Sequence, residues 1–166
     1  MLAVFLVAPS VNAEAVPISD RHIQIIKTNC LSAQSSIQQL QRTEAATRVN
    51  RGRAYESISK LLVALNSRVT VNKLNAPVLA AATTEMDKRF TTFKSDYSQY
   101  EDSMMATIKL SCRDQPVTFY DALNHTRELR AKVATDIKSL NETLDTYQDG
   151  VNELRASVMQ TAKVPR

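Results

Sequence analysis

The ten residues RVNRGRAYES, 48–57, decide the fold of this chain. They hold three arginines and one of only two glycines in 166 residues. This stretch has three possible interpretations. It is a turn between two helices, a basic patch that binds an anionic partner, or a polar layer inside one long helix. Each of them leads to a different architecture.

The residues around Gly52 favour the long helix. A glycine in a helix interior costs about 1 kcal/mol relative to alanine, which is a penalty and not a prohibition. The pairs Glu44–Arg48 and Glu56–Lys60 flank the glycine at i,i+4 spacing with the acid first, the order that stabilises a helix. We therefore predict that the chain continues as a helix through this stretch.

Core-type residues at alternating three- and four-residue spacing extend this prediction to three segments. In the first segment they are Ile23, Ile26, Cys30, Ala33, Ile37, Leu40, Glu44, Thr47, Arg51, Ala54, Ile58, Leu61 and Leu65. In the second they are Leu79, Ala82, Met86, Phe90, Phe93, Tyr97, Tyr100, Met104 and Ile108. In the third they are Phe119, Leu123, Thr126, Arg130, Val133, Ile137, Leu140, Leu144, Tyr147, Val151, Leu154 and Val158. The pattern is typical of coiled-coil-like helices, and its phase runs through Gly52 without a slip.

Composition and chain breaks give the predicted architecture. Two glycines, five prolines and no tryptophan favour a few long helices over the many turns of a sheet protein. NKLNAP, 72–77, and CRDQP, 112–116, interrupt the chain, because a proline disfavours helix at the residue before it. With Ser19 and Asp114 as helix caps, we predict helices over about 20–71, 76–112 and 115–161. The expected fold is all-α, an elongated antiparallel three-helix bundle with coiled-coil-like heptad packing, forming one domain over 16–166.

The N-terminal sequence predicts export. MLAVFLVAPSVNAEA, 1–15, has a short apolar run followed by small residues, as in a signal peptide cleaved after Ala13 or Ala15. It lacks the usual basic start, so an apolar N-terminal tail is the alternative. The run is too short to cross a bilayer, and the mature chain shows no membrane span. We expect an exported protein of the cell envelope or the extracellular space.

Two cysteines test the unbroken first helix. An even number of cysteines in an exported protein suggests a disulfide, here Cys30–Cys112. If the first helix is continuous, both lie about 40 and 36 residues from one turn, an offset of roughly 6 Å along the helices. If the chain reverses at Gly52, about 54 Å separates them, and a disulfide needs Cα atoms within about 7 Å. Two free thiols would favour the reversal and a four-helix arrangement.

A polar layer interrupts the predicted core. Glu44 and Arg51 occupy core positions of the first helix, and Arg130 reaches the same height on the last. A polar layer costs stability but can fix the register of packed helices. We predict that these three residues form a buried ion cluster with a structural role, and a ligand site is the alternative.

The sequence offers little for catalysis. His22 and His125 are the only histidines, and with the cysteines paired no zinc site of nitrogen and sulfur ligands can be assembled. The two glycines lie 98 residues apart, too far for a phosphate-binding loop. We therefore expect no enzyme activity, no catalytic residue, no metal, no cofactor and no small-molecule substrate.

The basic residues of the first half are the candidate contacts. Nine Lys and Arg against four Asp and Glu precede Thr84, whereas the remainder is close to neutral. Arg42, Arg48 and Arg53 could contact nucleic acid, anionic lipid or an envelope polymer. No aromatic residues are interleaved with these arginines as in single-strand binders. A solvated basic face is the competing interpretation.

Three phrases carry a resemblance to a known group. RVNRGRAYE, LVALNSRVTVNKL and CRDQPVTFYDAL resemble uncharacterised exported helical proteins of small-genome candidate-phylum bacteria. This resemblance implies export and an all-helical form, and it supplies neither an activity nor functional residues. In size, basicity and export alone the chain is similar to basic coiled-coil periplasmic chaperones, whose β-structure has no counterpart in this sequence.

The expected function follows from these observations. We expect an exported, non-enzymatic helical bundle with a structural or protein-interaction role at the cell envelope, with a protein partner or self-association. The alternative is a binder of clients or anionic polymer that uses the basic face of the first helix.

Overall fold

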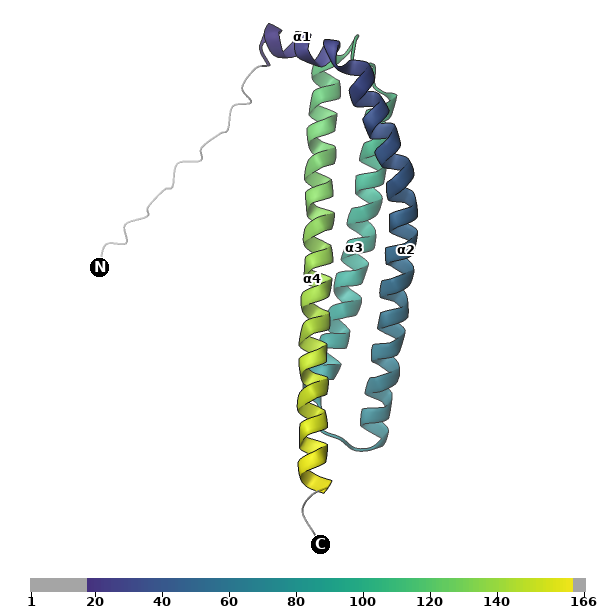
Figure 1. The fold of residues 1–166 in the computed structure, drawn as a ribbon, viewed down its shortest axis with the longest axis vertical. Helices are drawn as coiled ribbons and strands as arrows, with labels where there is room; N and C mark the ends of the chain where they lie inside the picture. The colour runs from purple at the N-terminus through teal and green to yellow at the C-terminus, as the bar shows by residue number, and fades with distance from the viewer. Residues whose placement is uncertain (1–17, 163–166) are drawn as a thin grey trace, which may run out of the picture.

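The computed structural model describes residues 18–162, and this part is formed by four helices without a strand (Figure 1). They are α1 (Asp20–Thr28), α2 (Cys30–Val71), α3 (Pro77–Lys109) and α4 (Pro116–Ala162). The all-α prediction is confirmed. The predicted signal peptide, 1–15, lies outside the described residues.

The first predicted helix, 20–71, is divided at Asn29, so the predicted count of three helices is wrong. Asn29 leaves helical geometry, and its side-chain amide donates to the carbonyl oxygen of Ile25 at 2.9 Å. Thr28 donates in the same way to Gln24 at 2.8 Å. These side-chain bonds lie at the end of α1, but similar Ser and Thr bonds occur inside the unbroken α2, so they do not by themselves explain the break. Figure 1 shows α1 lying across the end of the bundle instead of extending α2.

Beyond Asn29 the helix runs unbroken, as predicted. α2 passes through Gly52 to Val71, and the turn to α3 falls within the predicted break. Lys73 has a φ of 54° in this turn, and Pro77 is the first residue of α3. A reversal at Gly52 is excluded, so the opening stretch belongs to one long helix.

The second turn differs from the prediction in its details. α3 ends at Lys109 instead of 112, and α4 begins at Pro116. Asp114 is not the cap of α4, because its carboxylate accepts a hydrogen bond from the Ser111 hydroxyl at 2.6 Å. It therefore stabilises the turn and leaves the helix start to Pro116, which has no N–H to be capped.

The two cysteines meet at the same end of the bundle. Cys30 and Cys112 lie at disulfide distance, with Cα atoms 5.4 Å apart, and are joined in the structure. Both are buried, and Gln34 adds a hydrogen bond to the carbonyl oxygen of Leu110 at 2.9 Å. The start of α2 is thus attached to the turn that follows α3.

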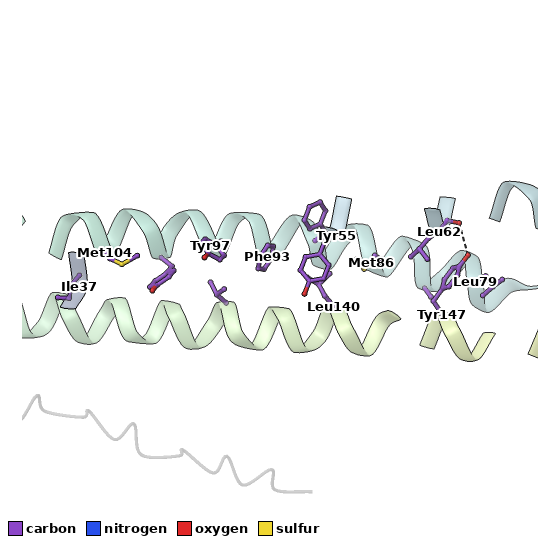
Figure 2. Close-up of a cluster of buried hydrophobic side chains, with 14 of the residues drawn as sticks. Ile37, Tyr55, Leu62, Leu79, Met86, Phe93, Tyr97, Met104, Leu140 and Tyr147 are labelled. Carbon is purple, nitrogen blue, oxygen red and sulfur yellow. Dashed lines mark hydrogen bonds between the residues drawn. The ribbon is translucent and has the colours of Figure 1, made fainter. Parts of the chain in front are cut away.

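The core lies mainly on α3. All nine residues of its predicted repeat are buried or packed against the buried cluster. Figure 2 shows side chains from α2 and α4 meeting this row, among them Tyr55, Leu62, Leu140 and Tyr147. The α4 prediction holds apart from its polar position Arg130 and its last residue, Val158, which is 43% exposed.

The α2 repeat contains a slip that the sequence analysis missed. Beyond Arg51 the buried residues are Tyr55, Leu62 and Val69, whereas the predicted Leu61 is 68% exposed. The stretch from Glu44 to Tyr55 covers eleven residues in three turns. A straight helix drifts from a strict heptad, and an eleven-residue step absorbs the drift. The phase therefore shifts by one residue next to Gly52.

The three long helices do not pack equally closely. α3 contacts both α2 and α4, but in the described part no Cα atom of α2 comes within 8 Å of one in α4. Side chains bridge this gap, since the Tyr147 hydroxyl donates to Asn66 Oδ1 at 3.0 Å and lies 3.3 Å from the carbonyl oxygen of Leu62. None of the described helices is long and apolar enough to cross a membrane.

Candidate interaction surface

A groove of about 820 Å³ lies between α2 and α3, and we call it the basic groove. Its lining residues are Arg48, Val49, Gly52, Arg53, Glu56, Ser59 and Lys60 of α2 and Asp87, Phe90, Phe93, Lys94, Tyr97 and Ser98 of α3. Four of these residues are cationic and two are acidic. The RVNRGRAYES stretch therefore forms one wall of the basic groove.

The floor of the basic groove is aromatic. Phe90 and Phe93 stack with ring centroids 6.4 Å apart, and Phe93 meets Tyr97 edge to face at 5.5 Å. Lys94 holds its Nζ 4.7 Å from the centre of the Phe90 ring, a cation–π contact. Gly52 leaves open space on the α2 side of the groove, because a Cβ at that position would meet no atom within 4 Å.

The rim carries paired and unpaired cations. Arg48 contacts Glu101 at 3.0 Å and Lys60 contacts Glu56 at 2.7 Å, and the Lys60 hydrogen bond lowers the pKa of Glu56. Arg53 is exposed and makes no ion pair with a described residue. Arg53 can therefore bind an acidic group of a partner without first breaking an ion pair within the protein.

Of the three arginines predicted to contact an anionic partner, the structure brings two together. Arg48 and Arg53 line the basic groove, whereas Arg42 is exposed on α2 outside it. The aromatic residues that the sequence analysis did not find among the arginines come from α3, about forty positions later. Only the packing of α3 against α2 places them together.

The predicted ion cluster is only partly formed. Arg130 approaches Glu44 at 3.5 Å, but Arg51 makes no ion pair with a described residue. The cluster is also not buried, because the Arg130 side chain is 56% exposed and Arg51 is exposed. Long guanidinium side chains reach the solvent from core-facing backbone positions, which explains the difference.

A second, smaller hollow of about 180 Å³ lies at this level between α2 and α4, and we call it the polar pocket. Its lining residues are Glu44, Thr47, Arg51, Tyr97, Tyr100, Arg130, Val133, Ala134 and Ile137. The Tyr97 hydroxyl donates to Glu44 Oε2 at 2.7 Å, and burial together with this bond raises the pKa of Tyr97. The Tyr100 hydroxyl is buried without a hydrogen-bond partner.

Two carboxyl groups face each other across α3 and α4 near this level. Asp96 is 3% exposed and accepts a bond from Lys132 Nζ at 2.9 Å. Burial raises the pKa of Asp136 on α4, and the neighbouring Asp96 raises it further. One oxygen of each carboxyl is buried without a donor among the described residues, and protonation of Asp136, which its raised pKa favours, would supply the missing hydrogen bond. Sequence offered no signal for this pair beyond two acids next to core positions.

The described residues hold no group of three His, Cys, Asp or Glu side chains that could bind a metal ion. His22 lies 2.9 Å from the Ser19 hydroxyl, and His125 is exposed beside Glu128. Comparisons with protein-family models, with curated proteins and with solved structures each find no match to this chain. Functional inference therefore depends on the geometry of the chain itself.

Proposed function

We propose that the protein is an exported, non-enzymatic interaction protein of the cell envelope that binds an acidic amphipathic helix of a partner protein in the basic groove. The groove carries the proposal, since it combines an aromatic floor with a cationic rim. Export is supported by the apolar N-terminal sequence and by the Cys30–Cys112 pair.

The dimensions of the groove suit a short helix. Arg48 and Lys60 mark its ends on α2, twelve residues or about 18 Å apart, which corresponds to three turns of a docked helix. Apolar side chains on one face of such a helix would pack against the exposed Val49, since Phe90 and Phe93 beneath the groove are only 8% and 1% exposed. Carboxylates along both flanks would meet Arg53, Lys60 and Lys94. A partner helix seated here completes a fourth position in the bundle.

The packing supports a finer description of the fold. We infer that α2, α3 and α4 form an elongated antiparallel three-helix bundle with coiled-coil-like packing, to which α1 is appended. The complete burial of the α3 repeat supports this inference. On the three phrases quoted above, we also place the chain with the exported helical proteins of candidate-phylum bacteria.

Binding of an anionic polymer is the second candidate function. The exposed Arg42, Arg53 and the Lys60 side chain on one helix favour it. A polymer without apolar groups would use the rim and leave Val49 uncovered. The two functions therefore differ in whether a bulky apolar residue inside the groove interferes with binding.

Gly52→Leu provides that distinction. The site is helical and has free space around an added Cβ, so leucine projects an apolar side chain into the groove without a change of charge. The probe is a synthetic 18-residue amphipathic helix with leucine on one face and glutamate on the flanks, measured by fluorescence anisotropy beside a scrambled peptide and a polyphosphate. We expect Gly52→Leu to weaken binding of the amphipathic peptide at least about 10-fold and to leave the affinity for polyphosphate unchanged.

Charge reversal at the rim of the basic groove is the second test of the proposal. Arg53→Glu combined with Lys60→Glu should weaken the peptide by about 10-fold or more, with the larger loss at low salt. Arg155→Glu on the exposed face of α4 is the matched control and should have little effect. Equal binding of the scrambled peptide, or indifference to both Gly52→Leu and the charge reversal, would contradict the proposal. Loss of polyphosphate binding on charge reversal alone would favour the second candidate.

A further inference from the structure

The polar pocket gathers hydrogen-bond donors that the fold does not use. Tyr100 is 1% exposed, and its hydroxyl has no hydrogen-bond partner among the described residues. Arg51 makes no ion pair with a described residue, and Arg130 has only the long contact to Glu44 at 3.5 Å. A buried hydroxyl without a partner is destabilising, so the pocket favours an occupant that accepts hydrogen bonds.

The volume and charge of the polar pocket limit the kind of ligand that it can bind. About 180 Å³ holds several water molecules or a small organic group. Two guanidinium groups and the Glu44 carboxylate leave one formal positive charge, which matches a monoanion better than a dianionic phosphate. Ile137 and its neighbour Val133 form an apolar wall against which a short alkyl chain can pack.

We propose that the polar pocket binds a short-chain monocarboxylate, with Arg51 and Arg130 holding the carboxylate and the Tyr100 hydroxyl donating to it. Guanidinium groups suit this role because their planar donors match a carboxylate. Glu44 is held by Tyr97 and limits the charge of the ligand. The carboxylate could belong to a free acid or to the C-terminus of a peptide. The polar pocket lies between α2 and α4 and shares only Tyr97 with the lining of the basic groove.

The test uses sodium propionate as the probe and the full mature protein, at constant ionic strength. NMR chemical shifts of the tyrosine rings and arginine side chains should change in a saturable way. Propionamide, the neutral isostere, should bind at least about 10-fold more weakly, because it lacks the charge that the guanidinium groups recognise. Inorganic phosphate should also bind more weakly than propionate.

Three variants locate the site. Arg51→Leu should weaken propionate binding at least about 10-fold, and Tyr100→Phe should weaken it about 5-fold. Arg53→Leu removes the same charge from the same helix outside the pocket, and it should leave propionate binding unchanged. Trialanine with a free or an amidated C-terminus identifies the source. Tighter binding of the free-acid peptide than of propionate points to a protein terminus, and the reverse order points to a free acid.

Three results would contradict the proposal. If propionate causes no saturable shift, if propionamide binds as tightly, or if Arg51→Leu has no more effect than Arg53→Leu, the pocket holds water and the proposal is wrong. Because Tyr100→Phe leaves the packing of the ring in place, its folded spectrum provides a check against general loss of structure.

Discussion

α4 and α2 both pack against α3, but they do so at different distances, and the two glycines of the chain mark the difference. At Gly150 on α4 an added Cβ would lie 2.8 Å from Leu79 Cδ2 and 3.2 Å from Val78 Cγ1. At Gly52 on α2 it would meet nothing within 4 Å. One glycine permits a close approach of helices, whereas the other borders an open groove.

The side chains between the helices account for this contrast. Small polar residues fill part of the α3–α4 interface, where the Thr126 hydroxyl lies 2.8 Å from that of Ser103 and 3.0 Å from that of Thr107. Aromatic rings fill the α2–α3 interface, with Tyr55 and Phe93 at 5.6 Å. Small residues let backbones approach, and large rings hold them apart and leave hollows beside them. The looser packing of α2 leaves the basic groove on its α3 side and the polar pocket on its α4 side.

The largest expected effect comes from the bond that holds the more loosely packed helix. Cys30→Ser should lower the free energy of unfolding by about 2–4 kcal/mol, because the bridged residues are 82 positions apart. Thermal unfolding measures the loss, and helical content at room temperature should stay nearly unchanged. Hydrogen exchange should increase most at the start of α2 and least in α4. Reduced wild-type protein is the control and should match the variant.

Mass spectrometry tests the bond itself. A non-reducing digest of protein taken from its native compartment should contain one peptide pair joined through Cys30 and Cys112. Two free thiols in that material would remove the support both for this stabilisation and for export.

The close interface should resist an added methyl group. Gly150→Ala should lower the free energy of unfolding by about 1 kcal/mol, because Leu79 is 1% exposed and has little room to move away. The cost of overpacking exceeds the gain in helix propensity, which is itself about 1 kcal/mol. Urea unfolding measures the change. A variant more stable than the wild type would show that the α3–α4 contact is looser than described.

The carboxyl pair adds a pH dependence to the same interface. The folded pKa of Asp136 lies above its ordinary value of 3.8, so folding becomes less favourable as the pH rises from about 4 through the folded pKa. Asp136→Asn supplies a permanent donor toward Asp96 and should stabilise the fold at pH 7 by about 1 kcal/mol.

This advantage should shrink as the pH falls toward 4 and disappear below it, because Asp136 then carries its own proton in the folded state and increasingly in the unfolded state. Urea unfolding between pH 4 and 8 measures it. Asp145→Asn, an exposed position on the same helix, is the matched control and should show no such trend. A pH-independent gain in Asp136→Asn would mean that the two carboxyls do not share a proton.

The smallest effect is expected at the open interface and has the opposite sign to that at Gly150. Gly52→Ala should raise the free energy of unfolding by about 0.5–1 kcal/mol, because alanine favours the helix and finds free space there. The melting temperature measured beside that of Gly150→Ala gives a direct comparison of the two interfaces. A decrease would show that the groove wall is closed by a movement of α2 or α3.

Much of the fold could be predicted because helices report their buried face through local spacing. The α3 repeat was correct at every position, since that helix is covered from two sides. The α2 repeat failed after Arg51, because a helix covered more loosely can shift its buried face by one residue without loss. The break at Asn29 escaped prediction because no proline or glycine marks it in the sequence.

The candidate sites were less predictable than the helices. Sequence pointed to Glu44, Arg51 and Arg130 as one layer, and the structure places all three around the polar pocket. It could not show that Arg51 lacks an ion pair or that Tyr100 lacks a hydrogen-bond partner. Both properties depend on distances between helices, to which a one-dimensional pattern is insensitive.

By itself, the sequence determined that this chain is helical, where its long helices turn, and that Cys30 and Cys112 lie at the same end. These features depend on local propensity, on proline and on the fixed rise of a helix. Only the tertiary structure decided that α3 is central, that α4 lies close and α2 farther away, and that aromatic residues of α3 lie beneath the arginines of α2. The size of the side chains between two helices sets their separation, and that separation exists only when both helices are in place.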